Sequence, residues 1–86
     1  MELVEIKTAI RTLITEIAED MEIPAEKITD NALFIKEMGL DSMALLEVLA
    51  TMEKKFGITI PETEFPTIST IEKCAVTVKK YIDLKG

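Results

Sequence analysis

Apolar side chains recur every three or four residues in three separate stretches of the chain. In the first stretch, which runs from Leu3 to Met21, the apolar positions are Ile6, Ile10, Leu13, Ile14, Ile17 and Met21. Because residues at this spacing share one face of an α-helix, the pattern predicts a long amphipathic helix. Ile23-Pro24 ends it, since proline disfavours the helical conformation in the preceding residue and has no N–H to donate.

The second stretch runs from Ser42 to Phe56 and carries two apolar faces. The broader face, which we expect to lie against the core, consists of Leu45, Val48, Leu49, Met52 and Phe56. A narrower face consists of Met43, Leu46 and Ala50, beside Glu47. On pattern alone such a face is more often part of a wide core than a docking site. Asp41 and Ser42 can cap the start of this helix, and Gly57 stands in the usual place at its end.

The third stretch predicts a final helix from about Thr70 to Leu84. Its inward positions are Ile71, Cys74, Ala75, Val78, Tyr81 and Ile82. Ser69-Thr70-Ile71-Glu72 has the pattern of a capping box, in which Ser69 accepts from the N–H of Glu72 and the glutamate reaches back. Before it, residues Glu62 to Pro66 can form one short helical turn, which we expect Pro66 to interrupt.

Between the first two helices, Ile28 to Leu40 shows no sustained period. Its apolar residues, which can anchor it to a core, are Ile28, Leu33, Phe34, Ile35, Met38 and Leu40. The segment is interpreted as a long ordered loop with one helical turn, in which Gly39 can take a positive φ. The elements together predict an all-α, four-helix up-down bundle, with three longer helices and one short third helix, formed by a single domain over residues 1–86.

Composition narrows the functions that such a bundle can have. Sixteen acidic and ten basic residues give a net charge of −6, which argues against nucleic acid and anionic membranes as partners and favours proteins with basic patches. No apolar run reaches the roughly 20 residues of a membrane span, and the start lacks the basic segment of a secretory signal. We therefore expect no membrane span, a cytoplasmic location and a monomer.

Histidine is absent, which removes the usual general base and most metal sites. The one cysteine, Cys74, lies on an apolar face and is predicted to be a buried free thiol. Ser42 cannot act as a catalytic nucleophile, because no histidine exists and the lysine nearest in sequence, Lys36, lies on the irregular segment. We expect no catalytic residue, no metal site and no enzymatic activity.

Ser42 is nonetheless the residue with the most distinctive setting. A serine in the first turn of a helix exposes its hydroxyl where free backbone N–H groups and the helix dipole favour an attached phosphate. The surrounding motif is Gly39-Leu40-Asp41-Ser42-Met43, followed by Leu46, Glu47, Leu49, Phe56-Gly57-Ile58 and Ile60-Pro61. Over nearly the whole chain this pattern resembles the acyl carrier proteins, although many carriers have a short third helix without proline.

The resemblance implies a prosthetic group and the enzymes that use it. Ser42 would carry 4'-phosphopantetheine, transferred from coenzyme A by a phosphopantetheinyl transferase, and Leu40, Asp41 and Met43 would flank it as the motif. The terminal thiol would hold acyl groups as thioesters for acyltransferases, ketosynthases or acyl-carrier synthetases.

The resemblance also implies two binding surfaces. The second helix is the one that partner enzymes of the family recognise, and the residues expected to meet them are Met43, Leu46, Glu47, Ala50 and Glu53. The family also admits the acyl chain between its helices. The residues that could line such a space are Leu45, Leu49, Met52, Ile60, Ile71 and Ala75. The sequence alone favours these six residues as ordinary core.

The pathway is less closely defined than the carrier class. Carriers of fatty acid synthesis usually have a strongly acidic second helix, whereas residues 41–56 here hold three acidic and two basic side chains, with Ala44 where an acidic residue is common. This favours a specialised carrier for a polyketide-like, modified-lipid or other dedicated pathway, with a primary fatty-acid carrier as its competitor. An aminoacyl or D-alanyl carrier and an unmodified helical interaction module of the same fold remain alternatives.

Overall fold

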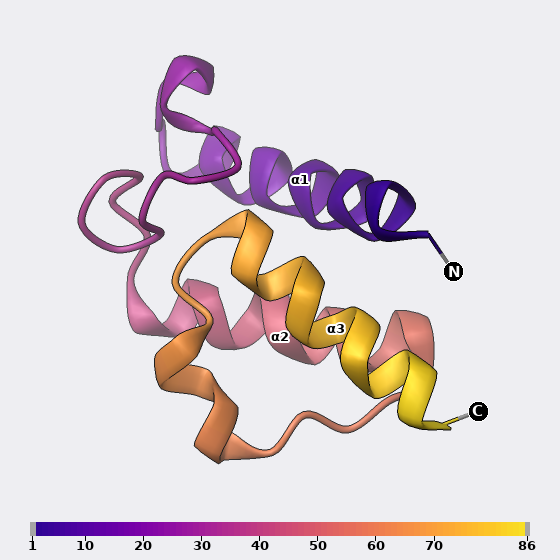
Figure 1. The fold of residues 1–86 in the computed structure, drawn as a ribbon. Helices are drawn as coiled ribbons and strands as arrows, with labels where there is room; N and C mark the ends of the chain where they lie inside the picture. Colours follow the sequence, from indigo (N-terminus) through magenta and orange to yellow (C-terminus); the bar gives the residue numbers. More distant parts are fainter. Residues whose placement is uncertain (1, 86) are drawn as a thin grey trace.

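The computed structural model describes residues 2–85, whose regular secondary structure is helical throughout. Three α-helices, α1 (Leu3–Asp20), α2 (Ser42–Phe56) and α3 (Ile71–Lys85), are joined by segments that contain two 3₁₀-helices, η1 (Ala25–Lys27) and η2 (Glu62–Thr67). α1 packs against both α2 and α3 and runs in the opposite direction to them (Figure 1). The predicted all-helical bundle, with three longer helices and one short third helix, is confirmed.

The core lies where the three helices and the loop before α2 meet. Its fully buried large side chains are Ile6, Ile10, Ile14, Phe34, Met38, Leu40, Val48, Leu49, Met52, Ile68, Ile71 and Val78. The predicted stripes therefore do face inward except at Met21, and one predicted anchor of the aperiodic segment, Ile35, is exposed as well. Met21 is 38% exposed and Ile35 is 53% exposed, so neither is the core anchor that the pattern predicted.

α1 ends one residue earlier than predicted, and its last turn explains why. Glu22 adopts a left-handed φ of 59°, and the N–H of Ile23 donates to the carbonyl of Ala18 at 2.8 Å. This six-residue closure reverses the chain and satisfies a terminal carbonyl of the helix. Met21 lies beyond the helix as a result, which is why its side chain leaves the buried stripe.

The predicted long loop of residues 28–40 is ordered by hydrogen bonds at both of its ends. One turn is closed by the N–H of Glu37, which donates to the Leu33 carbonyl at 3.0 Å, and Gly39 takes a φ of 83°. The N–H of Phe34 donates to the carbonyl of Ser69 at 2.9 Å, across to the segment before α3. The loop is therefore a fixed part of the structure that leads into α2.

A charged cluster fixes the start of the same loop. Lys7 and Arg11 on α1 both pair with Asp30, and Lys7 also pairs with Glu72 on α3. The carbonyl of Asp30 accepts from the N–H of Glu72 at 3.0 Å. Three elements that are distant in sequence thus meet at Asp30.

The predicted capping box at Ser69 is wrong by one residue. Thr70 precedes the first residue of α3, and its hydroxyl oxygen accepts from the N–H of Lys73 at 3.1 Å. The N–H of Glu72, which the box assigned to Ser69, donates to Asp30 instead, and the Glu72 carboxylate pairs with Lys7. Partners from the loop and α1 therefore replace the local reciprocal bonds.

Pro66 lies inside η2 and does not interrupt it, contrary to the prediction. Proline has no N–H, but its fixed φ fits a 3₁₀ turn. The surrounding bonds are made by other groups, because the Thr67 hydroxyl donates to the Glu64 carbonyl at 2.7 Å and the Ile68 N–H donates to the Phe65 carbonyl at 3.1 Å. The third helix is consequently a 3₁₀-helix of six residues.

Candidate functional site

Ser42 is the first residue of α2, and its position is fixed from both sides. Asp41, not Ser42, is the N-cap, since an oxygen of its carboxylate accepts from the N–H of Ala44 at 2.8 Å. Leu40, one residue earlier, is buried in the core and anchors the approach to the helix. Ser42 itself is exposed, so its hydroxyl is presented to solvent on a rigid helix start.

The electrostatics of this helix start suit an attached anion. The N–H groups of the first turn have no partner within the helix, and they carry the positive end of its dipole. No acidic side chain lies in the first turn of α2, and Lys54 and Lys55 lie in the last turn, where they suit the negative end. The site therefore fits a phosphodiester on the Ser42 oxygen, although the Asp41 carboxylate on the preceding residue is a like charge.

A surface hollow lies directly beside Ser42. It is lined from α1 and the residue after it by Ile17, Asp20 and Met21, and from the start of α2 by Asp41, Met43, Ala44, Leu46 and Glu47. Met43 is 74% exposed and Leu46 is 45% exposed, and Ala50 is exposed one turn further along. We call Met21, Met43 and Leu46, with the carboxylates of Asp20, Asp41 and Glu47, the α1–α2 surface.

The sequence did not identify the α1 side of this surface. Met21 was assigned to the core stripe of the first helix, and only the left-handed turn at Glu22 moves it to the surface.

Glu53 was expected among the residues that contact partner enzymes. The structure places it half-buried, where its carboxylate accepts from the N–H of Ile60 at 2.8 Å and holds the segment that follows α2.

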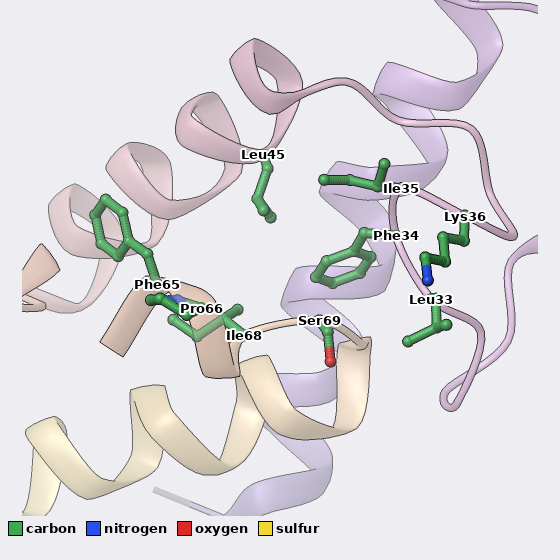
Figure 2. A pocket seen from close by; sticks show the side chains of 9 residues that line it. All are labelled: Leu33, Phe34, Ile35, Lys36, Leu45, Phe65, Pro66, Ile68 and Ser69. Carbon is green, nitrogen blue, oxygen red and sulfur yellow. The ribbon is translucent and has the colours of Figure 1, made fainter. Parts of the chain in front are cut away.

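A largely apolar cavity of about 330 Å³ lies between the loop, α2 and η2 (Figure 2). Its lining residues are Leu33, Phe34, Ile35, Lys36, Leu45, Phe65, Pro66, Ile68 and Ser69. Figure 2 shows the Leu45 side chain pointing from α2 toward the space between the loop and η2. Leu45 follows Ser42 by three residues, which makes the two neighbours on the helix surface.

Of the six residues predicted to line an acyl pocket, only Leu45 contributes to this cavity. The other five, which are all at most 3% exposed and belong to the packed core, are Leu49, Met52, Ile60, Ile71 and Ala75. The remaining walls come from the loop, from η2 and from Ile68 and Ser69, which follow η2. Neither segment has a helical period, so the sequence offered no signal that would bring them together.

Cys74 is buried and free, as predicted, and burial raises the pKa of its thiol to about 12. Among residues 2–85 no group of three acidic or cysteine side chains could hold a metal ion. None of the helices within that range is long and apolar enough to cross a membrane.

Comparisons with known proteins agree with the site. A family described as "Phosphopantetheine attachment site" matches residues 11–75. This range contains Ser42, the whole of α2 and all the residues that line the cavity. Acyl carrier proteins of Helicobacter pylori strains G27 and HPAG1 are each 34% identical over 67 residues, which cover 78% of this chain and 81% of the relative. The cofactor of the family is covalently attached 4'-phosphopantetheine. The chain belongs to the acyl carrier protein family.

Proposed function

We propose that Ser42 is the attachment point of 4'-phosphopantetheine and that the chain carries acyl groups, without catalysing a reaction itself. The observation that carries this proposal is the placement of Ser42. Ser42 is exposed in the first turn of α2 and directly follows the N-cap residue Asp41, whose carboxylate already accepts from one backbone N–H. It is one helical turn from Leu45, which lines an apolar cavity. Ser42 thus combines an exposed hydroxyl with a site for an anion and a nearby cavity for an apolar chain.

The chain's own residues have modest but definite roles at this site. In a phosphopantetheinyl transferase, the Ser42 oxygen would bond to the phosphorus that carries the pantetheine arm of coenzyme A. That phosphorus would lose its bond to the leaving adenosine bisphosphate, and a base of the transferase would take the hydroxyl proton. The helix start favours the resulting phosphodiester, by about 0.3 to 1 kcal/mol at an exposed position. Asp41 opposes it slightly by like-charge repulsion, while its cap keeps the serine at a fixed place. Once attached, the arm supplies a thiol that holds an acyl group as a thioester.

The cavity next to Leu45 is the best candidate for the acyl chain. Its walls are aliphatic and aromatic, with Lys36 and Ser69 as its polar members. Burial of an apolar chain there is favourable in proportion to the apolar area removed from water. The same lining argues for apolar acyl groups over aminoacyl or D-alanyl groups, because a buried ammonium needs a charged or hydrogen-bonding partner. Ile35, half exposed beside the cavity, is placed to cover such a chain.

The α1–α2 surface is the candidate docking site for partner enzymes. It places two exposed apolar residues, Met43 and Leu46, among three carboxylates and directly beside Ser42. A partner with a basic patch around an apolar side chain would match it, and the charged rim would chiefly set the association rate and the choice of partner. The partners expected on this surface are the transferase, acyltransferases, ketosynthases and acyl-carrier synthetases.

The structure gives a local reason for the weakly acidic α2. Ala44 is only 7% exposed, so a carboxylate at that position would be buried against the core at a substantial cost. We infer a specialised carrier, for a polyketide-like or modified-lipid pathway, with a primary fatty-acid carrier as the alternative. The two kinds of carrier can be distinguished by comparing turnover of the loaded chain by a primary fatty-acid ketosynthase with turnover by candidate pathway enzymes. The monomeric state and the cytoplasmic location stay predictions.

Intact mass spectrometry tests the attachment directly. The chain is incubated with coenzyme A and a promiscuous phosphopantetheinyl transferase, beside Ser42→Ala and Ser69→Ala. These are the two serines of the sequence, so Ser69→Ala is a matched control. Wild type and Ser69→Ala should each gain one phosphopantetheinyl unit, and Ser42→Ala should gain none. No uptake by an initially unmodified wild type would favour the unmodified interaction module, and uptake by Ser42→Ala would refute Ser42 as the attachment point.

A further inference from the structure

A three-residue contact joins η2 to α3. One carboxylate oxygen of Glu64, on η2, accepts a hydrogen bond from the Tyr81 hydroxyl at 2.6 Å and another from the Lys80 ammonium at 2.8 Å. The Lys80 ammonium also lies 5.2 Å from the centroid of the Tyr81 ring. We call these three side chains the η2–α3 link. Within α3, Lys80 and Tyr81 lie in the second half of the helix.

The link is attached to a wall of the cavity. Glu64 is followed directly by Phe65 and Pro66, and both of these residues line the cavity from the η2 side (Figure 2). None of the residues of η2 is buried. Its flanking residues Ile60 and Ile68 are buried and fix its ends, so that the middle of the segment depends on partly exposed contacts.

This arrangement makes η2 the wall with the least buried anchorage. The facing walls belong to α2 and to the loop, where Leu45 projects from a regular helix and Phe34 is fully buried and hydrogen-bonded to Ser69. An acyl chain longer than the cavity needs additional space. Displacing Phe65 and Pro66 outward supplies that space at the cost of the contacts that Phe65 makes with the core, and it also carries Glu64 away from Tyr81.

We propose that Glu64 and Tyr81 are specificity-determining residues, which set the length of the acyl chain that the cavity admits. This inference rests on the proposed function. Short chains fit while the link is intact, whereas longer chains enter only by breaking it. The link therefore lowers the occupancy of the cavity by long chains and leaves that of short chains unchanged. Glu64 and Tyr81 act on the chain through the wall and do not touch the thioester.

Charge supports the persistence of the link near neutral pH. The hydrogen bonds from Lys80 and Tyr81 lower the pKa of Glu64. The hydrogen bond to Glu64 raises the pKa of Tyr81, because it favours the protonated phenol beside the carboxylate. Glu64 is thus ionised and Tyr81 protonated at neutral pH, which are the forms that the bond requires.

The test uses Tyr81→Phe, which keeps the ring and removes only the bonding hydroxyl, and Glu64→Gln as a second variant. Asp83→Asn is the matched control, since it removes a charge from α3 in an ion pair with Lys79 that does not reach η2. A phosphopantetheinyl transferase loads each protein with acetyl-, hexanoyl- and decanoyl-phosphopantetheine from the corresponding coenzyme A thioesters, and loading is verified by mass. Two quantities are measured for each chain length: the rate of thioester hydrolysis and the melting temperature.

Sequestration should slow hydrolysis, and a chain bound only to the folded state should raise the melting temperature. We expect the two link variants to slow hydrolysis of the decanoyl thioester by about two- to threefold relative to wild type, the low end of the usual effect of one part-buried hydrogen bond. Hydrolysis of the acetyl thioester should stay the same, as should every length in Asp83→Asn. The ratio of decanoyl to acetyl rates is the decisive readout, because a general loss of stability would not change it in this direction.

The outcomes separate the inference from the function on which it rests. Loaded link variants with the wild-type ratio would refute the inference alone, as would an equal change in Asp83→Asn. A wild-type chain that takes up no acyl-pantetheinyl mass would refute the proposed function and the inference with it. A raised ratio of decanoyl to acetyl hydrolysis in Tyr81→Phe would also overturn the inference, since it would show that the link favours long chains.

Discussion

Replacing Asp41 by alanine tests how the start of α2 is held. The structure assigns the cap to the Asp41 carboxylate, which accepts from the N–H of Ala44 at 2.8 Å, and leaves Ser42 as the first helical residue. Asp41→Ala removes both the acceptor and a negative charge at the positive end of the helix dipole. Asp41→Asn keeps an acceptor oxygen and removes only the charge. Ser42→Ala removes neither.

The three substitutions should lower the free energy of unfolding by different amounts, most for Asp41→Ala and least for Ser42→Ala. Loss of a side-chain cap costs about 1 kcal/mol, and loss of the exposed charge costs a few tenths more. We expect Asp41→Ala to lower the free energy of unfolding by about 1 to 1.5 kcal/mol and Asp41→Asn by about 0.3 to 0.5 kcal/mol. Ser42→Ala should fall within about 0.5 kcal/mol of wild type, because alanine is a better helix former than serine at an uncapped position.

Urea titration followed by circular dichroism measures these differences. With a slope of roughly 1 kcal/mol per molar for so small a domain, the midpoint for Asp41→Ala should fall by about 1 to 1.5 M with the slope unchanged. The reasoning fails if Asp41→Ala and Asp41→Asn unfold together, since the carboxylate acceptor would then contribute nothing. It fails equally if Ser42→Ala is the most destabilised of the three, because the serine would then be the cap.

Three further predictions concern other parts of the molecule. Burial raises the pKa of Cys74 to about 12, so the native apo chain should not react with a disulfide reagent at about pH 8. The urea-unfolded chain should show one reactive thiol in the same assay. A fast reaction of the native chain would contradict this prediction. Gly57→Ala should lower the free energy of unfolding by about 1 kcal/mol in urea titrations, because Gly57 has a φ of 65°, and Gly57→Asn should cost less, because asparagine tolerates this conformation better. Hydrogen bonds from Lys80 and Tyr81 lower the pKa of Glu64, so its stabilisation is complete above about pH 4.3, the ordinary carboxyl pKa, and is lost as the pH falls through the lowered value. The stability difference between wild type and Glu64→Gln should accordingly shrink in acid, and a constant difference from neutral pH into acid would refute the assignment.

The elements that the sequence predicts well are those set by neighbouring residues. The bounds of α2 agree with the prediction at both ends, because a capping aspartate, a helical apolar period and a glycine with positive φ all lie within the element or next to it. Ser42 follows from the same signals. The apolar pattern alone did not predict the exposure of Met43 and Leu46, because it favoured a wide core face; their place beside Ser42 and the family resemblance indicated a surface instead.

The elements that it predicts poorly depend on partners from elsewhere in the chain. Thr70 replaces Ser69 as the cap of α3 because Asp30 and Lys7 bind Glu72, and no local pattern announces either residue. The cavity is still harder to predict from the sequence. Its walls come from an aperiodic loop and a 3₁₀-helix, and only Leu45 belongs to a predicted helical face.

The antiparallel course of α1 relative to α2 and α3 gives the bundle two unlike poles. α1 begins and α3 ends at one pole, and α2 begins at the other, which is the pole of Ser42 (Figure 1). A surface or a fused protein joined to the chain beyond either of those two helix ends would therefore face away from the serine. Immobilised in that orientation, the chain would offer Ser42 and the α1–α2 surface to enzymes arriving from solution.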